Sequence, residues 1–184
     1  MRIIAGSAGG ARLLAPKGLD TRPTPDMVRE ALFNIIAGEV EGARFFDAFA
    51  GTGAVGLEAL SRGAEFCYFT DIRSECVRII KKNAEITGFL KKSEIICGPA
   101  DKYLRILKTC DIMLHIIYLD PPYGKNLETP VIETIRDSGI LAEGGLIILE
   151  RGTGLDNDIQ LEPGLELYRR KRYGGTELSF IRKV

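Results

Sequence analysis

From Ala43 to Gly152 the sequence alternates short apolar runs with helical patterns, and this alternation restricts the possible folds more than any other feature. Strands are expected over Arg44–Ala48, Glu65–Thr70, Glu94–Cys97, Ile112–Leu119 and Leu146–Glu150. Helices are expected over Ala54–Ser61, Glu75–Thr87, Asp101–Leu107 and Leu127–Asp137. Strands and helices that take turns in this way predict an α/β fold, in which a parallel sheet has helices on both faces.

The C-terminal pattern differs from this alternation. Leu165–Tyr173 and Glu177–Arg182 are both strand-like, and Gly174-Gly175 joins them. Two glycines between strand-like runs indicate a hairpin. The sheet is therefore expected to be mostly parallel and to end in a C-terminal antiparallel hairpin.

The N-terminal segment combines two possible short strands, Arg2–Ala5 and Arg12–Ala15, with a helix that opens at Thr24-Pro25-Asp26. Thr24 suits a cap, Pro25 the first helical position, and Asp26 the positive end of the helix dipole. Apolar residues then recur on one helical face, at Val28, Leu32, Ile35 and Ile36, and Gly38 is expected to end the helix. We predict one domain over residues 1–184, in which residues 1–40 form an arm and a helix at the border of the active site.

Length and composition exclude several classes of protein. A chain of 184 residues buries enough surface to fold without disulfides or a structural metal. It has no apolar run long enough to span a bilayer and no secretory pattern at Met1, so we expect no membrane association and a cytoplasmic location. The four cysteines and the single histidine, His115, lack zinc-ligand spacing, so we expect core thiols, a packed His115 and no metal.

The net charge of zero conceals an uneven distribution. Residues 1–29 hold five basic and two acidic side chains, and residues 168–184 hold six basic side chains and one acidic one. Basic ends around an acidic middle suggest that a polyanion is bound where the two ends meet. A solvated surface without a partner explains the charges alone equally well.

A glycine-rich loop follows the first expected strand. Gly51, Gly53 and Gly56 fit the pattern G-x-G-x-x-G, and Asp71 lies 20 residues after Gly51 at the end of the next strand. Such a loop approaches a ligand closely, and the acidic residue suits a ribose diol. The expected ligand is therefore a nucleoside cofactor.

Asp47 helps to decide which nucleoside this is. A carboxylate beside the loop repels a pyrophosphate but suits the ammonium group of a methionine moiety, which favours S-adenosylmethionine over a nicotinamide dinucleotide. Asp101, after the third strand, is placed to accept a hydrogen bond from an adenine amino group, and a helix cap is the alternative role.

The most specific motif is Asp120-Pro121-Pro122-Tyr123, at the end of the fourth strand. The two prolines stiffen the turn, so that the Asp120 carboxylate and the Pro121 carbonyl project as acceptors. Tyr123 adds an aromatic surface. Two acceptors and a stacking plate suit an exocyclic amine on a planar base, and the carboxylate stabilises the charge that forms on nitrogen as the amine attacks a sulfonium methyl.

With these motifs the sequence resembles the Rossmann-like, S-adenosylmethionine-dependent amino-methyltransferases, and most of all the bacterial RsmD family of small-subunit ribosomal RNA guanine-N2 methyltransferases. The resemblance covers almost the whole chain, and its family-specific parts are the two ends, with residues 2–6, 22–34 and 173–180. It implies a Rossmann-like methyltransferase sheet.

The resemblance also implies roles for single residues. Those assigned to the cofactor are Asp47, Phe49, Gly51, Gly53, Asp71 and Asp101, with Arg22 and Thr24 at the border of the site. Those assigned to the target base are Asp120, Pro121, Pro122 and Tyr123. Relatives place several cations after Gly6, whereas residues 7–11 are nearly uncharged here, which shifts the expected RNA contact toward Arg169–Arg172.

The leading interpretation is transfer of a methyl group from S-adenosylmethionine to the exocyclic N2 of a guanine in small-subunit rRNA, by a monomer that acts on the RNA or on an assembling subunit. Transfer to another nucleic-acid base or to a protein glutamine amide is the first alternative. A nicotinamide-dependent oxidoreductase and a catalytically idle RNA-binding protein are more distant ones.

Overall fold

The computed structural model describes residues 1–16, 26–122, 127–154, 161 and 163–184. The strands are β1 (Arg44–Asp47), β2 (Phe66–Asp71), β3 (Ser93–Cys97), β4 (Leu114–Leu119), β5 (Leu141–Gly152), β6 (Leu165–Tyr173) and β7 (Thr176–Lys183). The helices are α1 (Asp26–Ile35), α2 (Ala37–Val40), α3 (Ala54–Ser61), α4 (Ser74–Ile86), α5 (Ala100–Thr109) and α6 (Glu128–Ser138), with a short 3-10 helix at Leu90–Lys92.

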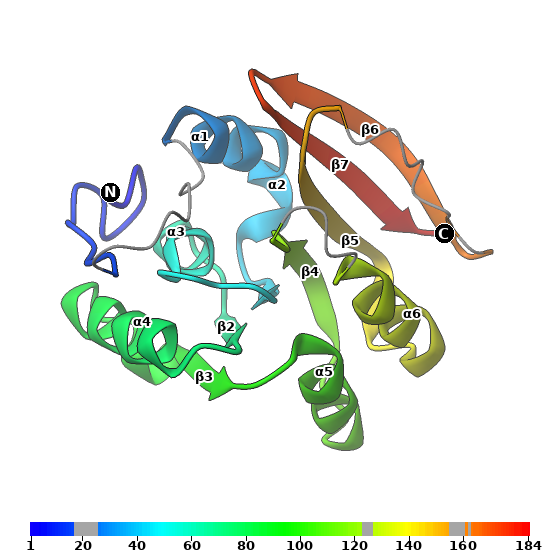
Figure 1. Cartoon of the computed structure of the whole chain (residues 1–184), viewed down its shortest axis with the longest axis horizontal. Helices are drawn as coiled ribbons and strands as arrows, with labels where there is room; N and C mark the ends of the chain where they lie inside the picture. The colour runs from blue at the N-terminus through cyan, green and yellow to red at the C-terminus, as the bar shows by residue number, and fades with distance from the viewer. Residues whose placement is uncertain (17–25, 123–126, 155–160, 162) are drawn as a thin grey trace.

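The strands form a single sheet in the order β3-β2-β1-β4-β5-β7-β6. The first five in this order pair in parallel, whereas β7 is antiparallel to both β5 and β6. The expected parallel sheet with a C-terminal antiparallel hairpin is confirmed. Strand β1 lies in the middle between β2 and β4, so the loops that follow β1 and β4 meet at one edge of the sheet (Figure 1).

Helices cover both faces of the sheet, and each face has its own hydrophobic core. Helices α1, α3 and α4 pack on one face, through side chains such as Leu32, Leu57 and Ile80. Helices α5 and α6 pack on the other, through Leu104 and Ile135 (Figure 1). We call the face covered by α1, α3 and α4 the α1 face, and the face covered by α5 and α6 the α5 face.

Several local expectations were wrong. Helix α1 ends at Ile35, and Gly38 lies inside the short helix α2 rather than ending the first helix. His115 is exposed, because it lies at the amino end of the sheet beside the first residue of β1, where its Nδ1 accepts a hydrogen bond from the Arg44 N–H at 3.0 Å. Cys97 and Cys110 are also exposed, so only Cys67 and Cys76 are core thiols.

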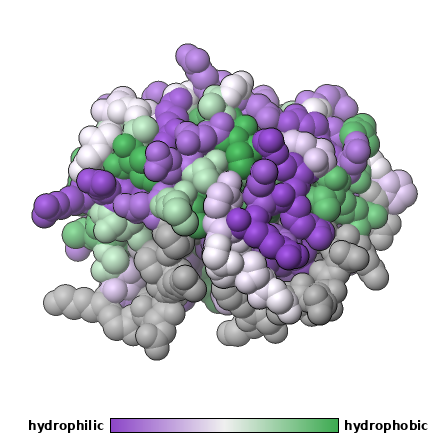
Figure 2. All heavy atoms as spheres, turned by 90° about the horizontal axis from the view of Figure 1, so that it is seen from above, coloured by the Kyte–Doolittle hydropathy of each residue, from purple (hydrophilic) through white to green (hydrophobic). Residues whose placement is uncertain are grey.

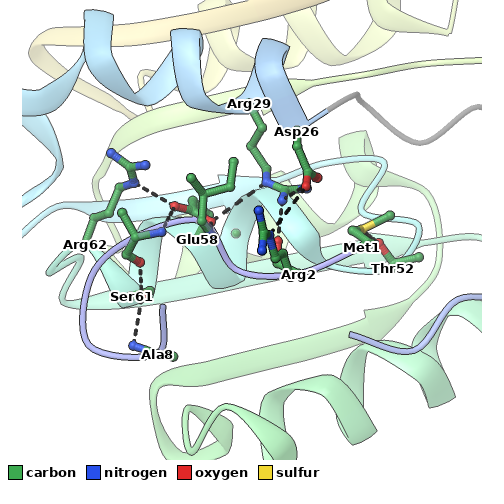
Figure 3. A network of polar contacts seen from close by, with 12 residues as sticks. Met1, Arg2, Ala8, Asp26, Arg29, Thr52, Glu58, Ser61 and Arg62 are labelled. Atoms are coloured by element: carbon green, nitrogen blue, oxygen red, sulfur yellow. Dashed lines mark hydrogen bonds and ion pairs between the residues drawn. The ribbon is translucent and has the colours of Figure 1, made fainter. Parts of the chain in front are cut away.

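The first residues of the chain form a small hairpin with an isolated antiparallel bridge between Arg2 and Arg12, instead of the two short strands that were expected. It docks on helix α3 through Glu58, whose carboxylate accepts hydrogen bonds from the N–H groups of Ile4 and Ala5 at 2.7 and 3.0 Å. Figure 3 shows this buried carboxylate between two arginines.

Both arginines are ion-paired with Glu58. Arg62 lies 2.8 Å and Arg29 of α1 lies 3.8 Å from its oxygens, and the side chains of Arg29 and Glu58 are fully buried. The arm, α1 and α3 are therefore joined by one network of charges.

In the part of the chain that the structure describes, no helix is long and apolar enough to cross a membrane.

Candidate active site

The glycine loop between β1 and α3 has a conformation that only glycine adopts readily. Gly51 and Gly53 have φ angles of 57° and 77°, and Gly53 begins helix α3 as its N-cap residue. Gly56 is required for another reason, since a Cβ there would lie 2.3 Å from the Phe69 ring. Gly51 is half-buried, and a Cβ there would meet nothing closer than the Phe49 carbonyl oxygen at 4.0 Å, so a ligand can approach the backbone at this point while α3 packs tightly on β2.

Asp71, the last residue of β2, fixes the loop from the side. Its Oδ2 accepts a hydrogen bond from the Gly51 N–H at 3.0 Å, and its Oδ1 accepts one from the Arg73 N–H at 2.9 Å. The Arg73 guanidinium also pairs with this carboxylate at 3.1 Å. The predicted ribose-binding residue thus lies against the glycine loop.

Asp47, the last residue of β1, is buried behind the loop. Its Oδ2 accepts a hydrogen bond from the Gly56 N–H at 3.0 Å, in the first turn of α3. Burial raises the pKa of Asp47 from 3.8 to about 7, the hydrogen bond from Gly56 opposes this, and the charge of Asp71 adds to it. Two carboxylates therefore lie close enough to repel each other at the ends of adjacent strands.

Asp120 follows β4 directly and completes this row. Burial raises the pKa of its carboxyl group well above its ordinary value, and the charges of Glu150 and Asp47 raise it further. Pro121 is buried and Pro122 is exposed, so the turn leaves the sheet at this point. The structure brings Asp47, Asp71 and Asp120 to one edge, as their positions at strand ends predicted.

Glu150 and Tyr118 also lie at this site, although neither was among the residues predicted from the sequence. Glu150 ends the buried stretch of β5 and is 2% exposed, and the Tyr118 hydroxyl of β4 donates a hydrogen bond to its Oε2. The available signal was the one that identified the other acids, an acidic residue at the carboxyl end of an apolar strand. Because Glu150 raises the pKa of Asp120, it acts on the candidate reaction centre.

Asn83, a fully buried residue in the last turn of α4, was not predicted from the sequence either. Its Nδ2 donates to the carbonyl oxygens of Leu14 and Thr52 at 3.0 and 2.9 Å, and its Oδ1 accepts from the Leu14 N–H at 2.8 Å. One side chain therefore ties the N-terminal arm to the glycine loop. A polar residue inside an amphipathic helix gave no signal for this role.

The remaining candidates are less closely placed. Phe49 is half-buried in the loop and packs against the core of the α5 face. Asp101 lies in the first turn of α5 and does not cap it, because the N-cap position is Pro99, without a side-chain hydrogen bond. Arg22, Thr24 and Tyr123 lie outside the described residues.

The described residues thus give this edge of the sheet an acidic character and a backbone that a ligand can approach. Within them, no group of three or more His, Cys, Asp or Glu residues is placed to hold a metal ion. The arrangement suits a ligand that is positively charged at one end and carries a ribose diol at the other. The donor set therefore fits S-adenosylmethionine, with Asp47 and Asp71 nearest the loop.

Comparisons with known proteins agree with this chemistry. The profile of the family described as conserved hypothetical protein 95 matches residues 1–182. The chain is 33% identical to YlbH of Bacillus subtilis, over 100% of this chain and 99% of that protein. It is 32% identical to ribosomal RNA small subunit methyltransferase D of Escherichia coli, over 95% of this chain and 85% of that protein.

Among solved structures, the Escherichia coli protein yhhF is similar, with a TM-score of 0.86 and 28% identity over 100% of this chain and 97% of that one. The match of nearly the whole chain agrees with the acidic strand ends and the glycine loop, and together they identify the family of this protein. It belongs to the family of conserved hypothetical protein 95, the RsmD-like S-adenosylmethionine-dependent methyltransferases.

Proposed function

We propose that this protein transfers the methyl group of S-adenosylmethionine to the exocyclic N2 of a guanine in small-subunit ribosomal RNA. The observation that carries the proposal is the half-buried Asp120 carboxylate, followed by Pro121 and Pro122, beside the glycine loop. The name of the Escherichia coli relative, a small-subunit rRNA methyltransferase, supports the RNA class.

In this proposal the ends of β1 and β2 hold the cofactor. Asp71 binds the ribose diol, Asp47 faces the cationic methionine end, and the backbone at Gly51 and Gly53 lies against the ligand. Phe49 and Asp101 border the adenine. When bound, S-adenosylmethionine supplies an electrophilic methyl group on a sulfonium sulfur.

The end of β4 holds the base. The Asp120 carboxylate and the Pro121 carbonyl accept the two hydrogens of the exocyclic amine and turn its nitrogen lone pair toward the methyl group. As the N–C bond forms, the bond from the methyl group to the sulfonium sulfur would break and S-adenosylhomocysteine would be the leaving group, while the carboxylate stabilises the positive charge on nitrogen. The nitrogen then loses one proton, and the raised pKa of Asp120 suits a carboxylate that receives it.

Methyl incorporation tests this proposal. Unmodified small-subunit rRNA, free or in subunits, is incubated with the protein and S-adenosylmethionine labelled in the methyl group, and the digested RNA is analysed for N2-methylguanosine. We expect incorporation by the wild type, loss of at least a hundredfold with Asp120→Ala, which is the range for removal of one group that stabilises transition-state charge, and no loss with Glu133→Gln, an exposed acid on α6.

Two results would contradict the proposal. Equal background incorporation by the wild type and Asp120→Ala would exclude Asp120 chemistry on this RNA. Label recovered in DNA adenine or cytosine, or in protein glutamine, would assign the same chemistry to another substrate.

A further inference from the structure

Strand β6, at the edge of the sheet, carries four consecutive cations, and its pairing with β7 separates them by face. Arg169 and Lys171 pair with Phe180 and Leu178. Both partners belong to the hydrophobic core of the α1 face. Because side chains of paired residues project from the same face of a sheet, Arg169 and Lys171 lie on the α1 face, whereas Arg170 and Arg172 lie on the α5 face.

The two faces of β6 differ in their charge partners. On the α5 face, Glu177 of β7 pairs with Arg172 at 2.7 Å and with Arg170 at 3.5 Å. Arg169 and Lys171 are exposed, and no acidic side chain within the described ranges forms an ion pair with either of them. The cations of the α1 face therefore remain available to an external anion.

The same two cations lie level with the candidate reaction centre. The register places one row of residues across the sheet on the α1 face, which runs Asp47, Tyr118, Ile148, Phe180 and Arg169. The next row toward the carboxyl edge contains Glu150, Leu178 and Lys171, and the pairing of Leu119 with Leu149 places Asp120 beside Glu150 at its start. From β4 to β6 is three strand spacings, roughly 14 Å.

We propose that Arg169 and Lys171 bind phosphates of the RNA backbone next to the base held at Asp120. This inference rests on the proposed function for the identity of the polyanion. On the α1 face, each of the two rows has an acidic residue at one end, which suits a base amine. Each row has an exposed cation at its other end, which suits a phosphate. Figure 2 looks onto the molecule from the side where Figure 1 shows β6 and β7, and hydrophilic residues cover much of that side.

Protection of an edge strand is the competing explanation. Charged residues on an edge strand prevent other strands from pairing with it. This explanation treats the four cations alike, since a charge on either face protects the edge. It does not predict a difference between the two faces in RNA binding, and the experiment uses that difference.

The test compares two double variants that remove the same charge from the same strand. Binding of an unmodified small-subunit rRNA transcript is measured at several salt concentrations for the wild type, for Arg169→Ala/Lys171→Ala, and for the matched control Arg170→Gln/Arg172→Gln. Because each phosphate contact contributes about 0.7 to the salt slope for single-stranded nucleic acid, we expect the first variant to reduce the slope by about 1.4. Its Kd rises on the order of tenfold at low salt.

The control variant should change the slope by less than half as much, because Glu177 already neutralises part of its charge. The charge-conserving Arg169→Lys/Lys171→Arg should retain the wild-type slope, and thermal unfolding checks that all variants are folded. Equal effects of the two double variants, or no effect of either, would overturn the inference. Aggregation of Arg169→Ala/Lys171→Ala with an unchanged slope would favour edge protection and overturn it as well.

The outcome separates this inference from the proposed function. If the salt slopes change as expected but the wild type forms no N2-methylguanosine, the result supports the phosphate contacts of Arg169 and Lys171 and contradicts the proposed reaction. If N2-methylguanosine forms and Arg169→Ala/Lys171→Ala binds RNA as the wild type does, the result supports the proposed reaction and contradicts the phosphate contacts.

Discussion

Asp47 is a residue that serves two purposes, because it anchors the first turn of α3 and lies where a cationic ligand is expected. Its burial makes ionisation costly, and the neighbouring Asp71 adds to that cost. A bound positive charge would offset both effects. Ionisation of Asp47 therefore costs the most free energy when no ligand is bound. Because this cost arises only in the folded protein, the ionisation of Asp47 is coupled to the stability of the protein.

This coupling predicts a pH-dependent effect of Asp47→Asn. The pKa of Asp47 rises from 3.8 to about 7 on folding, so the folded protein holds a proton that the unfolded chain has released, and stability falls as the pH rises from about 4 to 7. Asparagine keeps an acceptor for the Gly56 N–H and does not ionise. Relative to the wild type, the variant should gain about 2–3 kcal/mol in the free energy of unfolding between pH 5 and pH 8.

Urea unfolding of both proteins at the two pH values measures this gain. The exposed acid Glu133, changed to Gln, provides the control and should show no such trend. A difference between wild type and Asp47→Asn that is the same at pH 5 and pH 8 would mean that Asp47 ionises normally in the folded protein.

At the scale of elements, helix α4 contributes to the site although none of its residues belongs to the row of acids at the carboxyl ends of the strands. Asn83 connects this helix to Leu14 of the arm and to Thr52 of the glycine loop with three hydrogen bonds. The loop conformation therefore depends on a helix that packs on β2 and β3.

Asn83→Leu keeps the size of the side chain and removes these hydrogen bonds. We expect the free energy of unfolding to fall by about 1–3 kcal/mol, because buried backbone groups lose their partners. The affinity for S-adenosylhomocysteine should fall on the order of tenfold, since the glycine loop is no longer held. Isothermal titration calorimetry and thermal unfolding measure the two effects, with the exposed Asn34→Leu as the control. Lower stability with unchanged affinity would restrict Asn83 to a structural role.

The sequence predicted the elements that depend on local pattern. β6 was predicted to the residue, as was helix α3, and the strand-end acids were placed correctly, because parallel strands bring their carboxyl ends to one edge. Contacts between distant segments carried no such pattern. Asn83, Glu58 and the Tyr118–Glu150 pair each act on a partner more than 30 residues away, and a periodic pattern reports only which face is buried. His115 was misplaced because an apolar run does not show where the helices stop covering the sheet.

At the scale of the whole molecule, Glu58 joins the arm to the body of the protein. Glu58→Gln removes the charge that faces the buried Arg29, so we expect a loss of about 3–5 kcal/mol in the free energy of unfolding. The exposed pair Arg44–Glu65, at 3.3 Å, is the matched control, and Glu65→Gln should cost less than about 1 kcal/mol. Urea unfolding compares them, and equal losses would show that the buried network contributes no more than a surface pair.

The docking of the arm has a consequence for the order in which the chain is completed during synthesis. Ile4 and Ala5 find their acceptor on Glu58, and Leu14 finds its partner on Asn83, which is 69 residues later. During synthesis these contacts of the arm must therefore wait until helices α3 and α4 have been translated. The glycine loop, whose Thr52 carbonyl also accepts a hydrogen bond from Asn83, gains that support at the same point. The arm and the loop are therefore both completed by a helix that is translated after them.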